Sequence, residues 1–220
     1  MAQDHPTEPQ DVDRKLADLR SQLERQFAAE RRELESQFAI LRAKMREERV
    51  QTFTRLVHGV RRLDSATSLT GVLEALAKGA VAEAARVAIL IVEGGVLRVW
   101  QHSGFLPGQE PFDIPVDMAG ILTAAVSRQQ TSIVSPGKAE SDPDLPSFMR
   151  PPAGNAGLVA PLVVGGEVVA LLYAEGADRR SAHEEAAAWA EEVELLVRHA
   201  AARLENVTSE RTVAVLTRTA

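Results

Sequence analysis

An eleven-residue repeat across the first part of the chain constrains the fold more than any other sequence feature. Residues 23–31 and 34–42 both follow the pattern Leu-Glu-x-Gln-Phe-Ala-x-x-Arg. Continued over residues 12–63, the repeat spaces apolar residues by four, three and four, which indicates a helix and excludes a strand. Eleven residues in three turns give about 3.67 residues per turn, which favours a right-handed or nearly straight bundle. The sequence therefore predicts one long helix whose apolar stripe needs a partner.

This stripe is the expected self-association surface, and a dimer is the expected assembly. Glu30, Arg49 and Thr52 interrupt it, and polar residues at such positions lower stability while fixing register or partner number. Facing Glu30 side chains would repel in a parallel dimer unless they splay outward. Parallel and antiparallel pairing therefore both stay open. The apolar stripe residues expected to mediate the association are Leu16, Leu19, Leu23, Phe27, Leu34, Phe38, Leu41 and Met45.

The net charge of −6 is unevenly distributed. Residues 12–63 hold 13 basic and 8 acidic side chains, whereas residues 64–206 hold 10 and 19. A basic helix could contact nucleic acid or anionic lipid. The basic residues are interleaved with glutamate, however, which favours the solvated outer surface of a coiled coil. With one tyrosine and six phenylalanines in the chain, stacking platforms for nucleic acid are not expected.

Several kinds of chemistry lack the residues they require. The chain has no cysteine, which excludes disulfides, thiolate metal sites and cysteine nucleophiles. The five histidines are scattered, and the two Gly-Gly pairs lie between expected strands, where no phosphate loop would form. The sequence contains no run of 18 apolar residues, so no membrane span is predicted. It also contains no apolar N-terminal stretch of the kind that a signal peptide requires. We expect a cytoplasmic protein that is not an enzyme and needs no cofactor or metal.

Local patterns divide the chain into four parts. We expect a disordered leader at 1–11, a coiled-coil helix at 12–62, a compact domain at 63–206 and a tail without clear pattern at 207–220. Gly59 weakens the helix and permits a bend near 58–66. Loop 135–156 is long enough to be functional or mobile.

Inside the compact domain the expected elements alternate between helices and hairpins. Capping residues 64–68 precede an amphipathic helix, and a capping box at 181–184 opens a final helix that ends near Asn206. These two helices should lie side by side on a sheet. Pro161 argues for an edge position or a bulge in its strand. The remaining expected elements are a hairpin over 87–102, an extended piece at 112–116, a short helix at 118–128, a strand at 131–134 and a hairpin over 157–173.

The order of these elements resembles the GAF domain family over about residues 63–206. The resemblance rests on Arg-Val-Ala-Ile-Leu-Ile-Val at 86–92, Phe-Asp-Ile-Pro-Val-Asp at 112–117, Gln-Thr-Ser-Ile-Val at 130–134 and, most specifically, the hairpin from Ala-Pro-Leu at 160–162 to Tyr173. It implies an α+β fold with a central antiparallel sheet and the first and last helices on one face. In many members the other face and its loops enclose a small-molecule pocket. Members regulate effectors through their terminal helices, often as dimers.

Departures from the family pattern narrow the expected function. The lack of cysteine excludes bilin attachment and methionine sulfoxide reductase activity, and no Asn-Lys-Phe-Asp-Glu-type motif of cyclic-nucleotide binders is present. The expected function is a signalling module that binds a small molecule and passes the signal to an effector protein. The alternative is a structural scaffold with an empty GAF-like head.

Three residues of the first hairpin are the candidate ligand site. Strand alternation places Arg98, Trp100 and His102 on one face, with Leu97 and Val99 turned toward the helical layer. An arginine is costly to bury unpaired, so this face should be wet or hold an anionic or polar ligand. Trp100 would stack on that ligand, and Arg98 would orient a carboxylate or phosphate. The alternative is that Trp100 packs beneath loop 105–117. Polar neighbours would favour a pocket, and aliphatic neighbours would favour the scaffold.

Overall fold

The computed structural model describes residues 9–135, 145–150, 155–176 and 185–218. The chain divides into two compact units, Met1–Thr52 and Phe53–Ala220. Helix α1 (Pro9–Ser65) begins in the first unit and ends in the second, which confirms the expected long helix. Proline suits the first helical position because an N–H there would have no helical partner. The expected leader at 1–11 lies mostly outside the described residues. Among the described helices, none has the length and hydropathy needed to cross a membrane.

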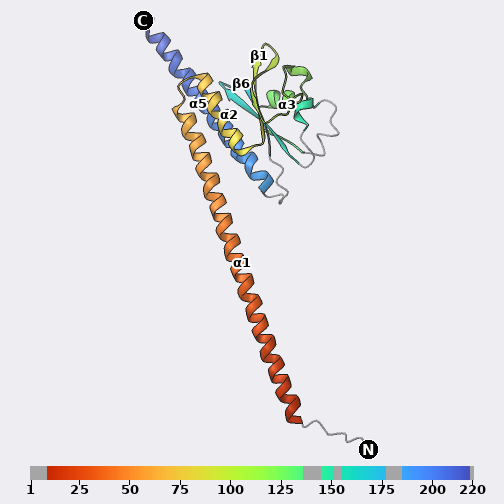
Figure 1. Cartoon of the computed structure of the whole chain (residues 1–220). Helices are drawn as coiled ribbons and strands as arrows, with labels where there is room; N and C mark the ends of the chain where they lie inside the picture. Colours follow the sequence, from red (N-terminus) through yellow and green to blue (C-terminus); the bar gives the residue numbers. More distant parts are fainter. Residues whose placement is uncertain (1–8, 136–144, 151–154, 177–184, 219–220) are drawn as a thin grey trace, which may run out of the picture. The chain divides into compact units, whose positions relative to one another are not determined.

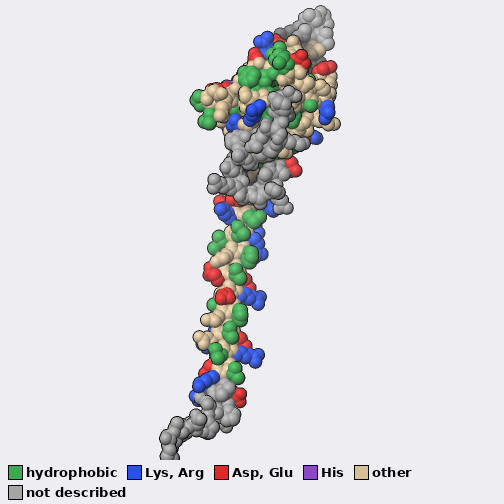
Figure 2. All heavy atoms as spheres, turned by 90° about the vertical axis from the view of Figure 1, so that its right-hand side faces the viewer, with side chains coloured by type: hydrophobic (Ala, Val, Ile, Leu, Met, Phe, Trp, Pro, Cys, Tyr) green, Lys and Arg blue, Asp and Glu red, His purple; other side chains and the backbone are tan. Residues whose placement is uncertain are grey.

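The first unit presents the apolar stripe of α1 to solvent. Its eight apolar members from Leu16 to Met45 are between 44% and 65% exposed in the single chain. Figure 2 shows hydrophobic side chains at intervals along this helix, with charged side chains between them. Local ion pairs such as Arg20–Glu24 and Arg31–Glu35 stabilise the helix itself by a few tenths of a kcal/mol. Among the described residues of this unit, none covers the stripe.

The second unit is built on one six-stranded antiparallel sheet with the order β3-β2-β1-β6-β5-β4. Both predicted hairpins are present and turn at Gly94-Gly95 and Gly165-Gly166, where all four glycines have positive φ. A two-residue turn of this kind matches the twist of the strands it joins. The strands are β1 (Arg86–Glu93), β2 (Val96–Ser103), β3 (Ile114–Pro115), β4 (Ser132–Val134), β5 (Gly157–Val164) and β6 (Glu167–Glu175).

Helices cover one face of this sheet. The helix α2 (Leu69–Glu83) lies beside α5 (Glu185–Arg218), as the sequence predicts (Figure 1). The Ser68 side chain caps α2 by accepting from the Gly71 N–H at 3.0 Å. The core under these helices joins residues from α1, α2, α5 and the sheet, including Leu63, Leu76, Ile89, Leu172 and Val193. The final segment of α1 is therefore part of this unit.

Close packing around Leu196 explains two glycines in this layer. A Cβ added to Gly59 of α1 would lie 2.9 Å from Leu196 Cδ2, and one added to Gly79 of α2 would lie 3.1 Å from Cδ1. Both helices can approach α5 only because these positions lack side chains. Accordingly, α1 does not break at Gly59; it ends at Ser65, and the chain turns before α2.

The other face of the sheet carries α3 (Ile121–Arg128) and two 3-10 turns, η1 (Val116–Met118) and η2 (Ser147–Met149). A second core lies beneath them, with Leu90, Leu97, Leu122, Phe148 and Tyr173 among its buried members. The sheet therefore has a core on each face. Contact with one core or the other shows on which face of the sheet each candidate site residue lies.

The surroundings of Pro161 agree with the sequence prediction, whereas the C-terminal helix is longer than predicted. Strand β4 pairs only with Gly157–Val159, so Pro161 lies past the paired edge, and a register shift follows between Leu162 and Val163. Both an edge position and a bulge are thus found near Pro161. At the other end of the domain, α5 continues through the expected tail to Arg218. The predicted capping box at 181–184 and most of loop 135–156 lie outside the described residues.

Candidate functional site

A bulge in β2 changes the faces of the residues predicted to bind a ligand. Ile89 pairs with Gln101 and Leu90 pairs with Val99, so Trp100 is the extra residue. A bulge interrupts the alternation of side chains along a strand. Arg98 pairs with Ile91, which packs on the helical core, whereas His102 pairs with Ala88 of the second core. Arg98 and Trp100 therefore share the helical face of the sheet, whereas His102 lies on the opposite face, so the three residues do not share one face.

The three side chains have separate surroundings. Arg98 is exposed and pairs with Glu93 through a 2.9 Å contact between Nε and Oε2. Trp100 is half-buried against the helical core. His102 is exposed, with its ring at 5.8 Å and nearly perpendicular to that of Phe105. Their role in ligand binding stays a prediction, but the structure does not bring them together.

The expected placement of Leu97 and Val99 is also wrong, although both precede the bulge. Leu97 is buried in the second core and Val99 packs against that core, so both face α3 and not the α2–α5 layer. Trp100 instead faces the helical layer. The predicted alternation of side chains over residues 96–99 is correct, but the two faces were assigned in reverse.

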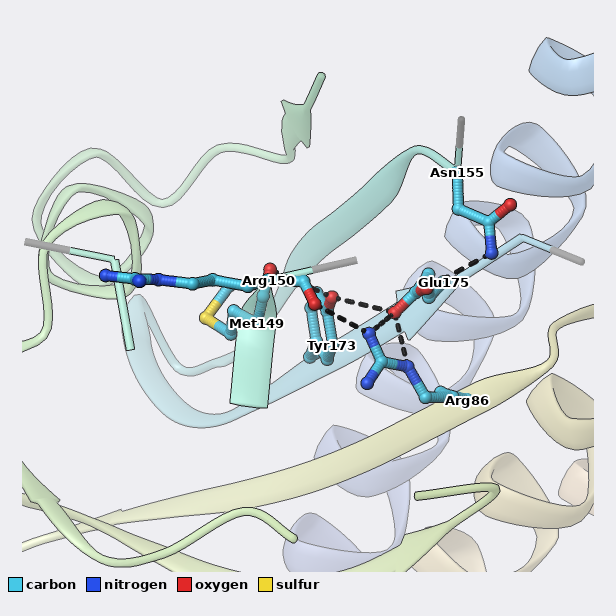
Figure 3. Close-up of polar contacts among 6 residues, drawn as sticks. All are labelled: Arg86, Met149, Arg150, Asn155, Tyr173 and Glu175. Carbon is cyan, nitrogen blue, oxygen red and sulfur yellow. Dashed lines mark hydrogen bonds and ion pairs between the residues drawn. The ribbon is translucent and has the colours of Figure 1, made fainter. Parts of the chain in front are cut away.

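A buried polar cluster lies on the α3 face, at the adjoining ends of β1 and β6. Arg86 and Glu175 are direct cross-strand partners, and both are buried. Figure 3 shows Arg86, Tyr173 and Asn155 converging on the Glu175 carboxylate. Arg150 contributes only its backbone carbonyl, because its side chain points away from Glu175. The cluster thus draws on two neighbouring strands and on two residues that follow η2.

Glu175 accepts a hydrogen bond from each of three side chains. Arg86 donates from Nε to Oε2 at 2.5 Å, and its Nη2 also contacts the same oxygen. Tyr173 donates to Oε2 at 3.2 Å, and Asn155 donates from Nδ2 to Oε1 at 3.3 Å. The carboxylate is therefore neutralised and well hydrogen-bonded, which a buried charge requires. Because a carboxylate only accepts, the contact also fixes the orientation of the Asn155 amide.

The rest of the cluster is rich in acceptors. Arg86 donates a further bond to the Arg150 carbonyl at 3.3 Å, and its guanidinium lies 5.1 Å from the centre of the Phe105 ring. Burial, followed by the charge of Glu175, raises the pKa of Tyr173 well above its usual value. Among the described residues, the buried Oδ1 of Asn155 has no hydrogen-bond partner. A buried acceptor left in this state costs about 1–3 kcal/mol.

This arrangement suits a ligand that donates a hydrogen bond better than it suits an anionic ligand. Arg86 is the cluster's one cationic side chain, and Glu175 already neutralises it. The free acceptor is the Asn155 amide oxygen, which an N–H or O–H group could satisfy. Within the described part of the chain, no three His, Asp or Glu side chains are grouped as metal ligands. The chemistry available is recognition by hydrogen bonding.

Sequence reasoning missed this cluster because its members are far apart in the chain. Arg86 and Glu175 are separated by 89 residues, and Asn155 adjoins a segment outside the described ones. One signal was present in the sequence. Arg86 is the first residue of the apolar strand β1, and Glu175 is the last residue of the apolar strand β6. A charged residue at such a position needs a partner. Only the pairing of β1 with β6 shows that each is the partner of the other.

An antiparallel sheet with the terminal helices on one face, and a short helix and a buried polar cluster on the other, defines an α+β domain. The chain belongs to the GAF domain family, whose model matches residues 64–207. GAF domains are generally regulatory or sensory modules. A comparison with curated protein sequences finds no match.

Solved structures share the fold at low sequence identity. The A. aeolicus nlh2 GAF domain in an inactive state is 14% identical, with a TM-score of 0.54 over 74% of this chain and 98% of that one. Residues 122 to 287 of a methyl-accepting chemotaxis protein are 19% identical, with a TM-score of 0.53 over 68% and 96%. Free methionine-R-sulfoxide reductase from Neisseria meningitidis, in complex with its substrate, is 17% identical, with a TM-score of 0.53 over 71% and 89%. At these identities the likeness shows the fold alone.

Proposed function

We propose that this chain is a non-enzymatic, cytoplasmic regulatory module that dimerises through α1, binds a small molecule and passes the signal to an effector protein. The observation that carries the ligand proposal is the buried acceptor Asn155 Oδ1 beside the Arg86–Glu175 pair. A ligand that presents an N–H or O–H donor would remove the cost of that unsatisfied atom. The ligand differs from the anion that Arg98 was expected to orient, because Arg98 is exposed and paired with Glu93.

The packing next to the cluster supports a relay to the helices. Gly176 follows Glu175, and a Cβ added there would lie 2.6 Å from Nε1 of Trp189 on α5. A small movement at the end of β6 would therefore press on that indole. Further along α5, His199 contacts Asp64 at 2.8 Å and Arg203 donates to the Ala66 carbonyl at 3.0 Å. These contacts connect α5 to the end of α1, the helix that would carry the signal.

Ligand binding is tested with Trp189 as the reporter. In a Trp100→Phe background Trp189 is the only indole, and its emission is followed during titration with metabolites that carry amide, amino or hydroxyl donors. We expect at least one compound to shift the emission, and Asn155→Ala to abolish the response. Arg98→Ala is the matched control and should leave the response unchanged. Loss of the response in Arg98→Ala, with retention in Asn155→Ala, would move the site back to β2.

The scaffold is the second candidate, and the packing of the α3 face favours it. Phe148, Met149 and Tyr173 are at most 1% exposed, so large side chains fill the described core on that face. The cross-strand partner of Arg98 is aliphatic Ile91, and Trp100 packs against the apolar helical core. If native mass spectrometry finds only the mass of the chain and no compound shifts the Trp189 emission, the scaffold function is the correct one.

Self-association is tested on the stripe itself. Phe27→Ala with Phe38→Ala removes two exposed stripe residues and should weaken the dimer by several kcal/mol if both rings are buried there. Ile40→Ala with Val50→Ala is the matched control, because these residues are also exposed but lie off the stripe. Sedimentation over a range of concentrations measures both. Equal effects of the two pairs would contradict association through the stripe.

A further inference from the structure

The two edges of the α1 stripe carry different residues. Four positions after Leu16, Phe27 and Phe38 come Arg20, Arg31 and Arg42, so a basic column runs along one edge. Four positions before Leu19, Glu30, Leu41 and Thr52 come Lys15, Gln26, Gln37 and Glu48, so the other edge is mostly neutral or acidic. Residues four apart lie on the same side of a helix, so each column adjoins the stripe.

We propose that α1 pairs with a second copy of this chain in parallel and in register. The proposal rests on the self-association described under the proposed function and adds the direction of the pairing. A twofold axis along two parallel helices places the basic edge of each against the neutral or acidic edge of the other. A twofold axis across two antiparallel helices places basic edge against basic edge, whatever their stagger.

Parallel pairing also gives the polar stripe residues partners. In register, Glu30 of one copy lies one residue along from Arg31 of the other, and Arg49 lies one residue along from Glu48. Arg42 lies near Gln37 and Glu48 across the same boundary. In the described part of the chain Arg31 pairs with Glu35, and its side chain is 82% exposed, so it can also reach a second helix. The expected repulsion between facing Glu30 side chains is thereby offset by the flanking arginines.

Cysteine cross-linking tests the direction, because the chain has no cysteine of its own. Leu23→Cys, Leu34→Cys and Met45→Cys place one thiol each in the column at the centre of the stripe. In a parallel pair every one of these residues meets its own copy within disulfide range, about 4.4–6.8 Å between Cα atoms. We expect copper phenanthroline to convert all three full-length variants to covalent dimers. Ala43→Cys, on the opposite side of the helix, is the control and should cross-link slowly.

Antiparallel pairing gives a different pattern. A residue then meets its own copy only at the centre of symmetry, so at most one of the three variants would cross-link. That result, or equally fast cross-linking of Ala43→Cys, would overturn the proposal. Sedimentation of the unaltered chain shows whether self-association itself fails or only the parallel direction of the pairing. A monomer at every concentration overturns both self-association and parallel pairing, whereas a dimer with only one cross-linking position overturns the direction alone.

Charge reversal gives an independent readout. Arg42→Glu brings like charges together across a parallel boundary and should raise the dimer Kd by roughly fivefold, since each unfavourable pair counts twice. Adding Glu48→Arg restores opposite charges and should return the Kd toward that of the unaltered chain. In an antiparallel pair Arg42→Glu would relieve repulsion between arginines, so a lower Kd for this single variant would contradict the proposal.

Discussion

The hydroxyl of Tyr173, the chain's one tyrosine, should resist ionisation while the domain is folded. Burial and the neighbouring Glu175 charge raise its pKa in the folded state above the usual value of about 10. Its contribution to stability is therefore complete below about pH 10 and is lost as the pH rises through the folded pKa. Absorbance titration should show no phenolate near pH 10 in the native chain, but should show it in guanidinium. Phenolate in the native chain at that pH would contradict the burial of this hydroxyl.

Two arginines of the first hairpin should differ sharply in their effect on stability. Arg86→Met leaves Glu175 buried without its cation, and breaking a buried pair costs about 3–5 kcal/mol. Arg98→Met removes an exposed pair with Glu93, for which less than about 1 kcal/mol is expected. Urea unfolding of both variants measures the contrast. Equal losses would show that the Arg86–Glu175 pair is not the buried contact described.

At the scale of elements, the packing of α1 on α5 depends on a glycine facing Leu196. Leu196→Ala should cost about 2–5 kcal/mol, because the side chain is buried between two helices. In that background Gly59→Ala has room for its methyl group and should stabilise the chain by about 1 kcal/mol through helix propensity. In the unaltered chain the same change meets Leu196 Cδ2, so its gain should be smaller. Denaturant melts of the double-mutant cycle measure this coupling.

A matched cycle shows whether the coupling is local. Leu90→Ala removes a buried residue from the core on the other face of the sheet. The effect of Gly59→Ala should be the same with and without Leu90→Ala, because distant sites act additively. A coupling with Leu90 as large as that with Leu196 would point to a general loosening of the domain.

Local sequence signals predicted the helices and hairpins, but the buried polar cluster depends on pairing between residues far apart in the chain. Gly94-Gly95 and Gly165-Gly166 announce their hairpins because a tight turn needs positive φ at those positions. The bulge at Trp100 has no such marker, since Val96–Ser103 contains no glycine or proline. This bulge places His102 on the face of the sheet opposite to that of Arg98. The buried cluster depends on β1 pairing with β6, which periodicity within either strand cannot reveal.

At the scale of the whole molecule, the boundary between the units determines which deletion tests self-association. The sequence placed the coiled coil at 12–62, but the second unit begins at Phe53, and its core includes Leu63 with Leu56 and Val60 packed against it. Arg55 also pairs with Glu83, whose side chain is only 4% exposed. Removing residues 1–62 would therefore damage the domain as well as the stripe.

Deletion of residues 1–52 should instead separate the two effects. The remaining chain keeps Leu56, Val60 and Leu63 in place and should still melt cooperatively, while its oligomeric state falls because the stripe of the first unit is gone. Deletion of residues 1–62 should lower the melting temperature further, because apolar contacts of the helical core are lost. Circular dichroism melts and sedimentation measure the two properties independently. If the chain lacking 1–52 associates as strongly as the intact protein, the interface lies on the GAF domain and not on the stripe.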